Sequence, residues 1–259
     1  MISRFVAAGI PQGEAIRTIE IETVNRCNGT CSFCPVNKNT DPQKAAIYDH
    51  CAFRKNHQRA CPDELFRLVG SFSNNEPFLD KRLVEFHRYA RQRLPSCRMH
   101  LFTNGTLLTK DKFLEIIPYL DELIINNYSD DTTIPENLNQ IMDCCREDPA
   151  LIAKVTVVLR RQNELLSSRG GDALNRQQLP DVGRDTCALP FQQLIIRPDG
   201  KVRPCCNDPL GKYTMGDLNH QTIAEIWGGA AFTHVRNQLK KGRNMLDKCR
   251  KCDAFHFYF

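Results

Sequence analysis

Thirteen cysteines in a chain of 259 residues are the feature that most limits what this protein can be. The first fourteen residues carry one arginine and no sustained apolar run, unlike a secretory signal, so we expect the chain to work in the reducing cytoplasm. Disulfide frameworks are rare there, and so many thiols are better explained as metal ligands. The longest apolar stretches are far too short to span a bilayer, which predicts no membrane association.

The composition is that of an ordinary folded protein. Hydrophobic residues make up 41% and charged residues 25% of the chain, enough to bury a core without cross-links. The net charge is +5, but the basic residues are scattered, so we expect no nucleic-acid-binding surface. The length suits one catalytic barrel with a small appendage, or two compact domains.

Strand and helix patterns alternate along the first two thirds of the chain. Apolar alternation and β-branched runs predict strands at 16–24, 99–102, 122–126 and 153–159, and helical spacing predicts helices at 80–94, 112–120 and 135–147. This rhythm is typical of βα units around a parallel sheet, whose functional groups gather at the carboxyl ends of the strands. The sequence therefore predicts an α/β fold.

The pattern changes near Pro180. A hairpin signal at Pro198-Asp199-Gly200 follows, and then two helical segments near 222–227 and 232–240. We therefore predict two domains, at 15–180 and 181–255.

Cys27, Cys31 and Cys34 form a Cys-x3-Cys-x2-Cys group directly after the first predicted strand. Three thiolates can hold three irons of a [4Fe–4S] cluster, and no fourth cysteine lies in the loop, so the fourth iron keeps an open position. An open position on a metal indicates chemistry rather than scaffolding. A zinc site or chance clustering is the alternative, but zinc sites favour paired Cys-x2-Cys units.

This triplet, with Phe33 just before its last cysteine, resembles the signature of the radical S-adenosylmethionine superfamily. The resemblance implies a partial (β/α)6 TIM-like barrel, and S-adenosylmethionine chelated to the open iron of a [4Fe–4S] cluster. It implies cleavage of that cofactor to a 5′-deoxyadenosyl radical, which abstracts a hydrogen atom from the substrate. Phe33 would lie near the adenine.

A second landmark of the superfamily is a Gly-Gly-Glu-Pro-like turn after the second strand. The corresponding turn here has Asn74 and Asn75 in place of the two glycines, followed by Glu76 and Pro77. Asparagine tolerates positive φ, so the turn remains possible. The resemblance also places Asn104 against the ribose or methionine portion of the cofactor. An ordinary Thr-Asn-Gly turn is the alternative for Asn104.

Four more cysteines, Cys187, Cys205, Cys249 and Cys252, supply a second set of thiolates. Their spacing, Cys-x12-Gly-x4-Cys and then Cys-x2-Cys, resembles the SPASM and shorter twitch extensions of radical enzymes. Only seven residues follow Cys252, too few for the further ligands of SPASM, so the twitch form with one auxiliary [4Fe–4S] cluster fits better. Four cysteines also make a common zinc site, which is the alternative. Cys206 could replace Cys205.

Within the superfamily the chain resembles the scyllo-inosamine dehydrogenases of aminoglycoside biosynthesis, in length, in both cysteine spacings and in an Arg-Gly-Gly turn at Arg169. This implies oxidation of a hydroxyl on a sugar, cyclitol or similar small molecule, with the auxiliary cluster placed to take up the second electron. Arg169 would lie beside the substrate or beside S-adenosylmethionine, as a candidate catalytic residue. The alternative is a turn arginine that neutralises a carboxylate, because its pKa, above about 12, makes it a poor base.

Two other functions stay open from the sequence. Related extensions occur in enzymes that modify peptide or protein side chains, so a peptide substrate is the first alternative. A non-catalytic zinc or iron–sulfur binding protein is the second. For an enzyme of this type, the resemblance also implies an electron donor such as flavodoxin or ferredoxin.

Residues 48–72 do not fit the pattern. The stretch is polar, rich in His, Arg and Cys, and shows neither a sustained helical apolar stripe nor a four-residue apolar strand before Ser73. A metal-binding insertion is one interpretation, although the spacings match no standard site. A compensated frameshift is the other, because a permitted back-translation of 51–67, read one nucleotide on, gives an amphipathic helix-like string.

Overall fold

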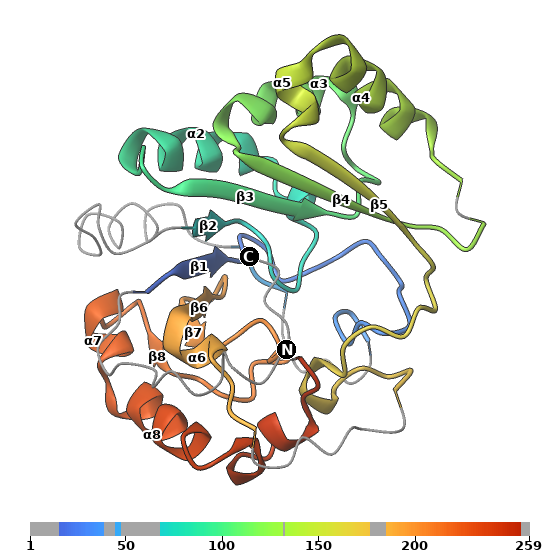
Figure 1. The fold of residues 1–259 in the computed structure, drawn as a ribbon. Coiled ribbons are helices and arrows are strands. Elements are labelled where there is room, and N and C mark those ends of the chain that lie inside the picture. The colour runs from blue at the N-terminus through green and yellow to red at the C-terminus, as the bar shows by residue number, and fades with distance from the viewer. Residues whose placement is uncertain (1–15, 39–44, 48–67, 132, 177–184, 255–259) are drawn as a thin grey trace, which may run out of the picture.

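The structure, a computed structural model, describes residues 16–38, 45–47, 68–131, 133–176 and 185–254. Their strands form one eight-stranded sheet in the order β5-β4-β3-β2-β1-β6-β7-β8 (Figure 1). The strands are β1 Thr18–Ile21, β2 Leu68–Gly70, β3 Arg98–Thr103, β4 Glu122–Tyr128, β5 Val155–Arg160, β6 Gln193–Ile196, β7 Lys201–Arg203 and β8 Gly216–Asp217.

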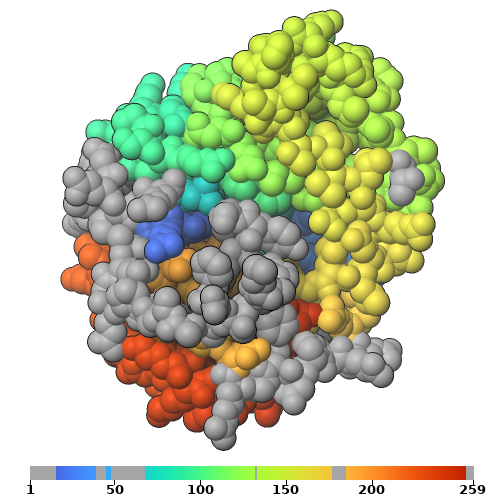
Figure 2. Space-filling model, viewed as in Figure 1, coloured from blue at the N-terminus to red at the C-terminus, as the bar shows by residue number. Residues whose placement is uncertain are grey.

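Helices cover one face of this sheet and extend below it. The α-helices are α2 Leu83–Arg93, α3 Lys110–Ile116, α4 Glu136–Glu147, α5 Pro149–Ile152, α6 Leu189–Gln192, α7 Ile223–Trp227 and α8 Ala230–Leu239. The 3-10 turns are η1 Pro77–Leu79, η2 Ile117–Tyr119, η3 Arg169–Gly171, η4 Arg243–Met245 and η5 Cys249–Lys251. In Figure 2 the green-to-yellow helical part and the orange-to-red C-terminal part lie at opposite ends of the molecule. No helix of the described ranges has the length and apolar character that a membrane crossing requires.

The predicted βα units are present and parallel. Each strand from β1 to β5 pairs in parallel with the next, and α2, α3 and α4 connect the later ones. The predicted hairpin is also confirmed, because β6 and β7 pair antiparallel around Pro198-Asp199-Gly200. Gly200 has φ of +82°, which explains a glycine at the end of that turn.

A sixth parallel strand, β6, joins the sheet beside β1 rather than beyond β5. The pairing runs from Thr18↔Gln193 to Ile21↔Ile196. The strand comes from the part of the chain that we assigned to the second domain, so the predicted domains 15–180 and 181–255 share one continuous sheet. The division into two domains stays a prediction.

Alternation along β1 explains what each face of the sheet does. Ile19 and Ile21 belong to the hydrophobic core that the helices cover. Glu20 and Glu22 point to the opposite, inner face, yet they are only 2% and 0% exposed. The inner face of the barrel therefore holds buried charge, which requires partners.

The core lies between the sheet and its helices, and the part that supports the site lies under α2, α3 and α4. Its fully buried strand residues include Met99, Leu101, Leu123 and Ile125. The helices contribute apolar residues at helical spacing, namely Leu83, Phe86, Phe113, Ile116, Leu138 and Ile141. This packing fixes the strands whose carboxyl ends carry the site.

Residues 68–72 bear on one expectation. Leu68–Gly70 form β2, a strand of three residues, where we noted that no four-residue apolar strand precedes Ser73. Three residues suffice because β2 lies between β1 and β3, and its backbone groups pair on both sides. Residues 48–67, including the segment of the frameshift hypothesis, lie outside the described residues.

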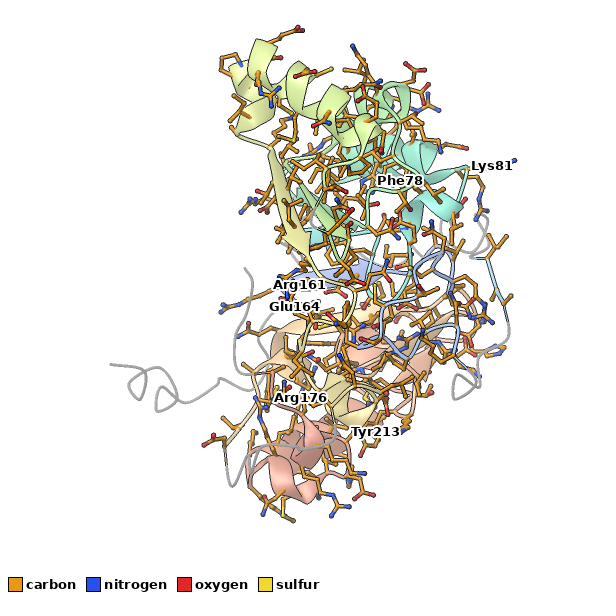
Figure 3. All side chains as sticks on the ribbon, turned by 90° about the vertical axis from the view of Figure 1, so that its right-hand side faces the viewer. Phe78, Lys81, Arg161, Glu164, Arg176 and Tyr213 are labelled. Carbon is orange, nitrogen blue, oxygen red and sulfur yellow. The ribbon has the colours of Figure 1, made fainter. Side chains whose placement is uncertain are left out.

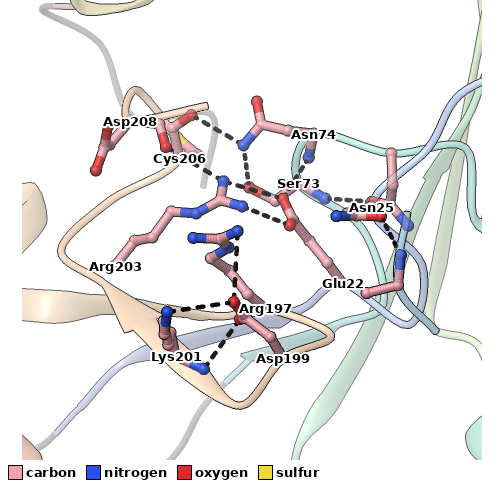
Figure 4. Close-up of polar contacts among 12 residues, drawn as sticks. Glu22, Asn25, Ser73, Asn74, Arg197, Asp199, Lys201, Arg203, Cys206 and Asp208 are labelled. Atoms are coloured by element: carbon pink, nitrogen blue, oxygen red, sulfur yellow. Dashed lines mark hydrogen bonds and ion pairs between the residues drawn. The ribbon is translucent and has the colours of Figure 1, made fainter. Parts of the chain in front are cut away.

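A buried ion pair joins β7 to the residue that follows β1. Both guanidinium nitrogens of Arg203 on β7 donate to Glu22, at 2.8 and 3.3 Å (Figure 4). The Glu22 carboxylate also accepts the backbone N–H of Asn74 at 3.0 Å. Arg203 is 1% exposed, so neither charge has water to replace a lost partner.

We predict that Arg203→Ala destabilises the fold by about 3–5 kcal/mol, because it leaves Glu22 buried without its counter-ion. The midpoint of urea unfolding, followed by circular dichroism under anaerobic conditions, measures the effect. Arg98→Ala is the matched control, since its ion pair with Glu122 is solvent-exposed and contributes at most about 1 kcal/mol. Equal losses in the two variants would contradict the prediction.

Candidate functional site

The first cysteine group lies on a partly exposed loop that follows β1. Cys27, Cys31 and Cys34 are all free thiols of intermediate exposure. The backbone N–H of Gly29 donates to Cys27 Sγ at 3.2 Å, and a β-carbon at this position would lie only 3.3 Å from that sulfur. The loop therefore wraps closely around its first thiol.

Burial makes these thiols reluctant to ionise on their own. It raises the pKa of Cys27 and of Cys31 to about 11, and the charges of the neighbouring thiols add to the effect. Iron supplies the positive charge that such thiolates need, and thiolate is a ligand that iron–sulfur clusters require. The donor set of this loop thus fits an iron–sulfur cluster.

No three His, Cys, Asp or Glu side chains in the described ranges are grouped so that they could hold a single metal ion. In a [4Fe–4S] cluster each thiolate binds a different iron, so its ligands need not converge on one point.

Glu76 ties the turn after β2 to the end of β3. Its carboxylate accepts hydrogen bonds from Thr103 Oγ1 at 2.7 Å, from the N–H of Asn104 at 2.8 Å and from the N–H of Phe78 at 3.1 Å. Burial raises the pKa of Glu76, and these three donors oppose the rise. Both oxygens are used within the protein, so Glu76 positions Asn104.

Asn104 reaches the first cysteine loop. Its side-chain amide donates to Asn28 Oδ1 at 2.9 Å and lies 3.8 Å from Cys27 Sγ. The turn that we gave as the alternative is also real, because Gly105 has φ of +77°. The two interpretations are compatible, since the turn directs the asparagine toward the loop.

Asn74 and Asn75 build their turn without positive φ, which among the described non-glycine residues only Asn37 and Arg169 adopt. Asn75 Oδ1 instead accepts the N–H of Ser73, two residues earlier in the chain, at 3.0 Å. Asn75 Nδ2 is buried and has no hydrogen-bond partner within the described residues. This orphaned donor, beside Glu76 and Pro77, fits an acceptor of a bound cofactor.

Phe33 is buried at the opposite side of the same loop. Its ring centroid lies 5.4 Å from that of Tyr128, at the end of β4. Burial raises the pKa of Tyr128 to about 12, with contributions from Cys31 and Cys34 that raise it and from Arg169 that lowers it. Phe33 and Tyr128 together form an aromatic wall beside the first cysteine group.

The second cysteine group is assembled in space. The pKa of the Cys205 thiol is raised by burial and by the neighbouring thiols Cys206, Cys187, Cys252 and Cys249. Three of the four predicted ligands, all but Cys187, line one cavity together with Lys248 and others. The four predicted ligands therefore come together, and the donor set fits a second cluster.

Cys206 has different surroundings from its neighbour Cys205. Its thiol is absent from the lining of the cavity, and the charges that act on it most are those of Glu20 and Arg169. Its backbone carbonyl accepts from Asn74 Nδ2 at 3.4 Å (Figure 4). The structure therefore favours Cys205 as the ligand and turns Cys206 toward the barrel interior.

Arg169 occupies a left-handed turn between the two groups. Arg169, Gly170 and Gly171 have φ of +53°, +62° and +85°, and a β-carbon at Gly170 would lie 2.7 Å from the carbonyl oxygen of Asn207. The Arg169 guanidinium donates to Asn74 Oδ1, while its Nε is buried with no partner in the described ranges. It therefore keeps one free donor in the interior.

The segment that carries this turn is fastened to the C-terminal part. Figure 3 shows Arg161 and Glu164 where the chain passes from the upper to the lower part, and Arg176 below them. Arg176 pairs with Asp253 at 2.6 Å, and the N–H of Ser168 donates to the same carboxylate at 2.6 Å. These bonds hold the Arg-Gly-Gly turn against the second cysteine group.

Two interior residues were not predicted from the sequence. Glu20 on β1 and Gln193 on β6 lie diagonally across the strand pair, since Gln193 pairs with Thr18, and Gln193 Nε2 donates to Glu20 Oε1 at 2.5 Å. The one signal was a charged residue on the strand that leads to a cysteine group. Alternation alone assigns such a residue to solvent, and only the curvature of the sheet encloses it.

A family model described as the SPASM iron–sulfur cluster-binding domain matches residues 187–253. The matched range begins at Cys187 and includes Cys205, Cys249 and Cys252. A relative from Niallia circulans, the S-adenosyl-L-methionine-dependent 2-deoxy-scyllo-inosamine dehydrogenase, is 26% identical over 236 residues, which are 91% of this chain and 92% of the relative.

Solved structures show the same arrangement. The crystal structure of BtrN in complex with AdoMet and 2-DOIA matches with a TM-score of 0.80 and 25% identity, over 93% of this chain and 94% of that one. Streptococcus suis SuiB bound to precursor peptide SuiA matches with a TM-score of 0.60 and 11% identity, over 92% of this chain and 70% of that one. At 11% identity the second match shows a shared fold alone.

We predict that replacing Cys27, Cys31 and Cys34 together by alanine removes one of two clusters. Iron and acid-labile sulfide after anaerobic reconstitution should fall from about eight to about four of each per chain. The matched control replaces Cys97, Cys144 and Cys145, which are buried in the core away from both groups. A single zinc ion that survives the first substitution would contradict the two-cluster prediction.

A second pair of variants tests the choice between adjacent thiols. Cys205→Ala should lose the iron of the second cluster, about four per chain, because Cys205 lies among the other three thiols. Cys206→Ala should keep all of the iron, since that thiol faces the barrel interior. Iron content decides between them, and the opposite result would make Cys206 the ligand.

Proposed function

We propose that this chain, a radical S-adenosylmethionine enzyme with a C-terminal domain of the SPASM type, oxidises a hydroxyl group of a cyclitol or similar polar small molecule. Its cofactors are [4Fe–4S] clusters and S-adenosylmethionine. The observation that carries the proposal is the match to an aminocyclitol dehydrogenase across nearly the full length of both chains. The interior of the barrel supports it, because buried polar groups line it.

The cofactor and the reduced first cluster, when bound, supply a 5′-deoxyadenosyl radical that can take a hydrogen atom from carbon. The protein's part is to hold and orient the reactants. We assign Cys27, Cys31 and Cys34 to the first cluster. Asn75 and Asn104 offer amide groups to the cofactor beside that loop.

A polar substrate fits the interior between the two cysteine groups. Asn74 and Arg169 are hydrogen-bonded to each other there, and Glu20 lies beside them on β1. A polyol or amino-polyol presents hydroxyl and ammonium groups that pair with such side chains, whereas an apolar substrate would leave them unsatisfied. Arg169 keeps a free donor, so we place it next to a substrate hydroxyl as a positioning group.

The second cysteine group lies close enough to this interior to serve the oxidation. The charges of Glu20 and Arg169 act on the thiol of Cys206, which is next to Cys205 in the sequence. Forming a carbonyl from a carbinol releases two electrons and two protons, and one hydrogen atom accounts for half of them. An auxiliary cluster at this position is a suitable acceptor for the other electron. Flavodoxin or ferredoxin in the cytoplasm is a suitable electron donor to the first cluster of the enzyme.

The two alternatives from the sequence have weaker support. SuiB, bound to its precursor peptide, shares the fold at 11% identity, which does not extend to its substrate. A non-catalytic metal-binding protein disagrees with the full-length match to a dehydrogenase.

We predict that the reconstituted enzyme transfers deuterium from a labelled carbinol carbon into 5′-deoxyadenosine and releases the ketone. Mass spectrometry of 5′-deoxyadenosine measures the transfer for a panel of cyclitols, amino-cyclitols and sugars labelled at each carbinol position. The triple Cys27/Cys31/Cys34→Ala variant is the control and should give no transfer. Transfer from a peptide side chain, with none from any polyol, would overturn the proposal in favour of peptide modification.

A further inference from the structure

Glu20 is a buried carboxyl group with one oxygen unused. It is 2% exposed, and its Oε1 accepts a hydrogen bond from Gln193 Nε2 at 2.5 Å. Its Oε2 is buried and has no hydrogen-bond partner in the part of the chain that the structure describes. Leaving such an oxygen unsatisfied is costly, so its retention points to a ligand that completes it.

The surroundings of Glu20 place this oxygen between the two cysteine groups. The ionisable groups that act on it are Glu22 directly after β1, Arg169 from η3, Arg203 from β7 and Cys206 from the loop after β7. Ser73, from the turn after β2, also lies beside the Glu20 carboxyl group. Groups from the end of β1, the turn after β2, η3 and β7 thus surround Glu20 in the interior.

Gln193 connects Glu20 to the second cysteine group. While its amide nitrogen donates to Glu20, its Oε1 accepts the backbone N–H of Cys206 at 3.4 Å. This bridge fixes the Glu20 carboxyl group in one orientation. The unused oxygen is therefore held in place before any ligand arrives.

We propose that Glu20 is the catalytic residue that accepts the proton of the substrate hydroxyl group. The inference rests on the proposed function. The O–H bond of the substrate breaks and a carboxyl O–H bond forms on Glu20. The carbinol C–H hydrogen leaves as an atom to the 5′-deoxyadenosyl radical, and the remaining electron leaves to a one-electron oxidant of the iron–sulfur class. Together these losses give the ketone.

The other ionisable groups of the interior are poorly suited to this task. Both oxygens of Glu22 are occupied by Arg203, and one also by Asn74. The guanidinium group of Arg169 carries only hydrogen-bond donors and offers no acceptor atom for a proton. Burial raises the pKa of the Cys206 thiol far above its usual range, so its thiolate is rare. Among the interior residues that the structure describes, Glu20 combines an unused oxygen with a suitable basicity.

The raised pKa of Glu20 determines how the rate of ketone formation should change with pH. Burial raises the pKa of Glu20 to about 8; Glu22 raises it further, while Ser73, Arg169 and Arg203 oppose the rise. A base must be ionised to accept a proton, so the rate of ketone formation should increase with pH up to about 8 and level off above it.

The test compares wild type, Glu20→Gln and Glu20→Asp by two readouts on the same holoenzyme samples. Deuterium transfer into 5′-deoxyadenosine reports hydrogen abstraction, and ketone yield reports completed oxidation. We expect Glu20→Gln to retain its iron and some transfer, but to lose ketone formation by about 10²–10⁴-fold, the usual contribution of a general base. Glu20→Asp should be slower than wild type and keep the rising pH limb, which Glu20→Gln should lose.

Glu115→Gln, an exposed change on α3, is the control for a lost carboxylate and should match wild type. Ketone formation by Glu20→Gln at the wild-type rate, or with the rising pH limb intact, would overturn the assignment while leaving the proposed function in place. Absence of deuterium transfer in wild type would instead refute the proposed function.

A measurement on the wild-type holoenzyme keeps the assignment testable if Glu20→Gln does not fold. Infrared difference spectra across pH 6–10 should show a protonated carboxyl band that disappears near pH 8, where the pKa of Glu20 lies. The band should shift when the substrate polyol is added. The absence of any carboxyl group titrating in this range would contradict the proposal.

Discussion

The pairing of β1 with β6 is the constraint on which the rest of the structure depends. Four residues of each strand run in parallel register, from Thr18↔Gln193 to Ile21↔Ile196. The first cysteine group follows β1, and the hairpin of β6 and β7 leads to Cys205. One ladder of backbone hydrogen bonds therefore sets the position of both thiol groups. A short strand pair can do this because it lies inside the sheet, where β2 and β7 support it on either side.

Glu20 and Glu22 show how two carboxylates on one face of a strand acquire different chemistry. Glu22 meets the paired nitrogens of Arg203, and this charge-assisted contact offsets the cost of burying it. Glu20 receives an amide from Gln193 in place of a dedicated counter-ion, and burial raises its pKa to about 8. The loss of water on burial dominates the environment of Glu20, whereas the ion pair with Arg203 dominates that of Glu22. The sheet thus separates a structural ion pair from a group able to change its protonation state.

Much of this arrangement could be predicted from the sequence, for identifiable physical reasons. Helices and strands with strong periodicity were placed correctly, and the cysteine spacings predicted groups that the fold brings together. Two features escaped prediction because they depend on distant parts of the chain. β2 has only three residues, and it is a strand because β1 and β3 flank it. Glu20 is buried because the strands and loops enclose the inner face, which no local pattern reveals.

The Arg-Gly-Gly turn shows why the interior is made from both ends of the chain. A non-glycine residue with φ of +53° costs about 1–2 kcal/mol, and this cost must be met by contacts elsewhere. Lys248 and Lys251 fill the space beside the two glycines, so larger residues there would collide with the C-terminal part. Because Arg169 contacts Asn74 from the turn after β2, it joins that turn to the second cysteine group. The strained arginine is therefore fixed only when the barrel and the C-terminal part are packed together.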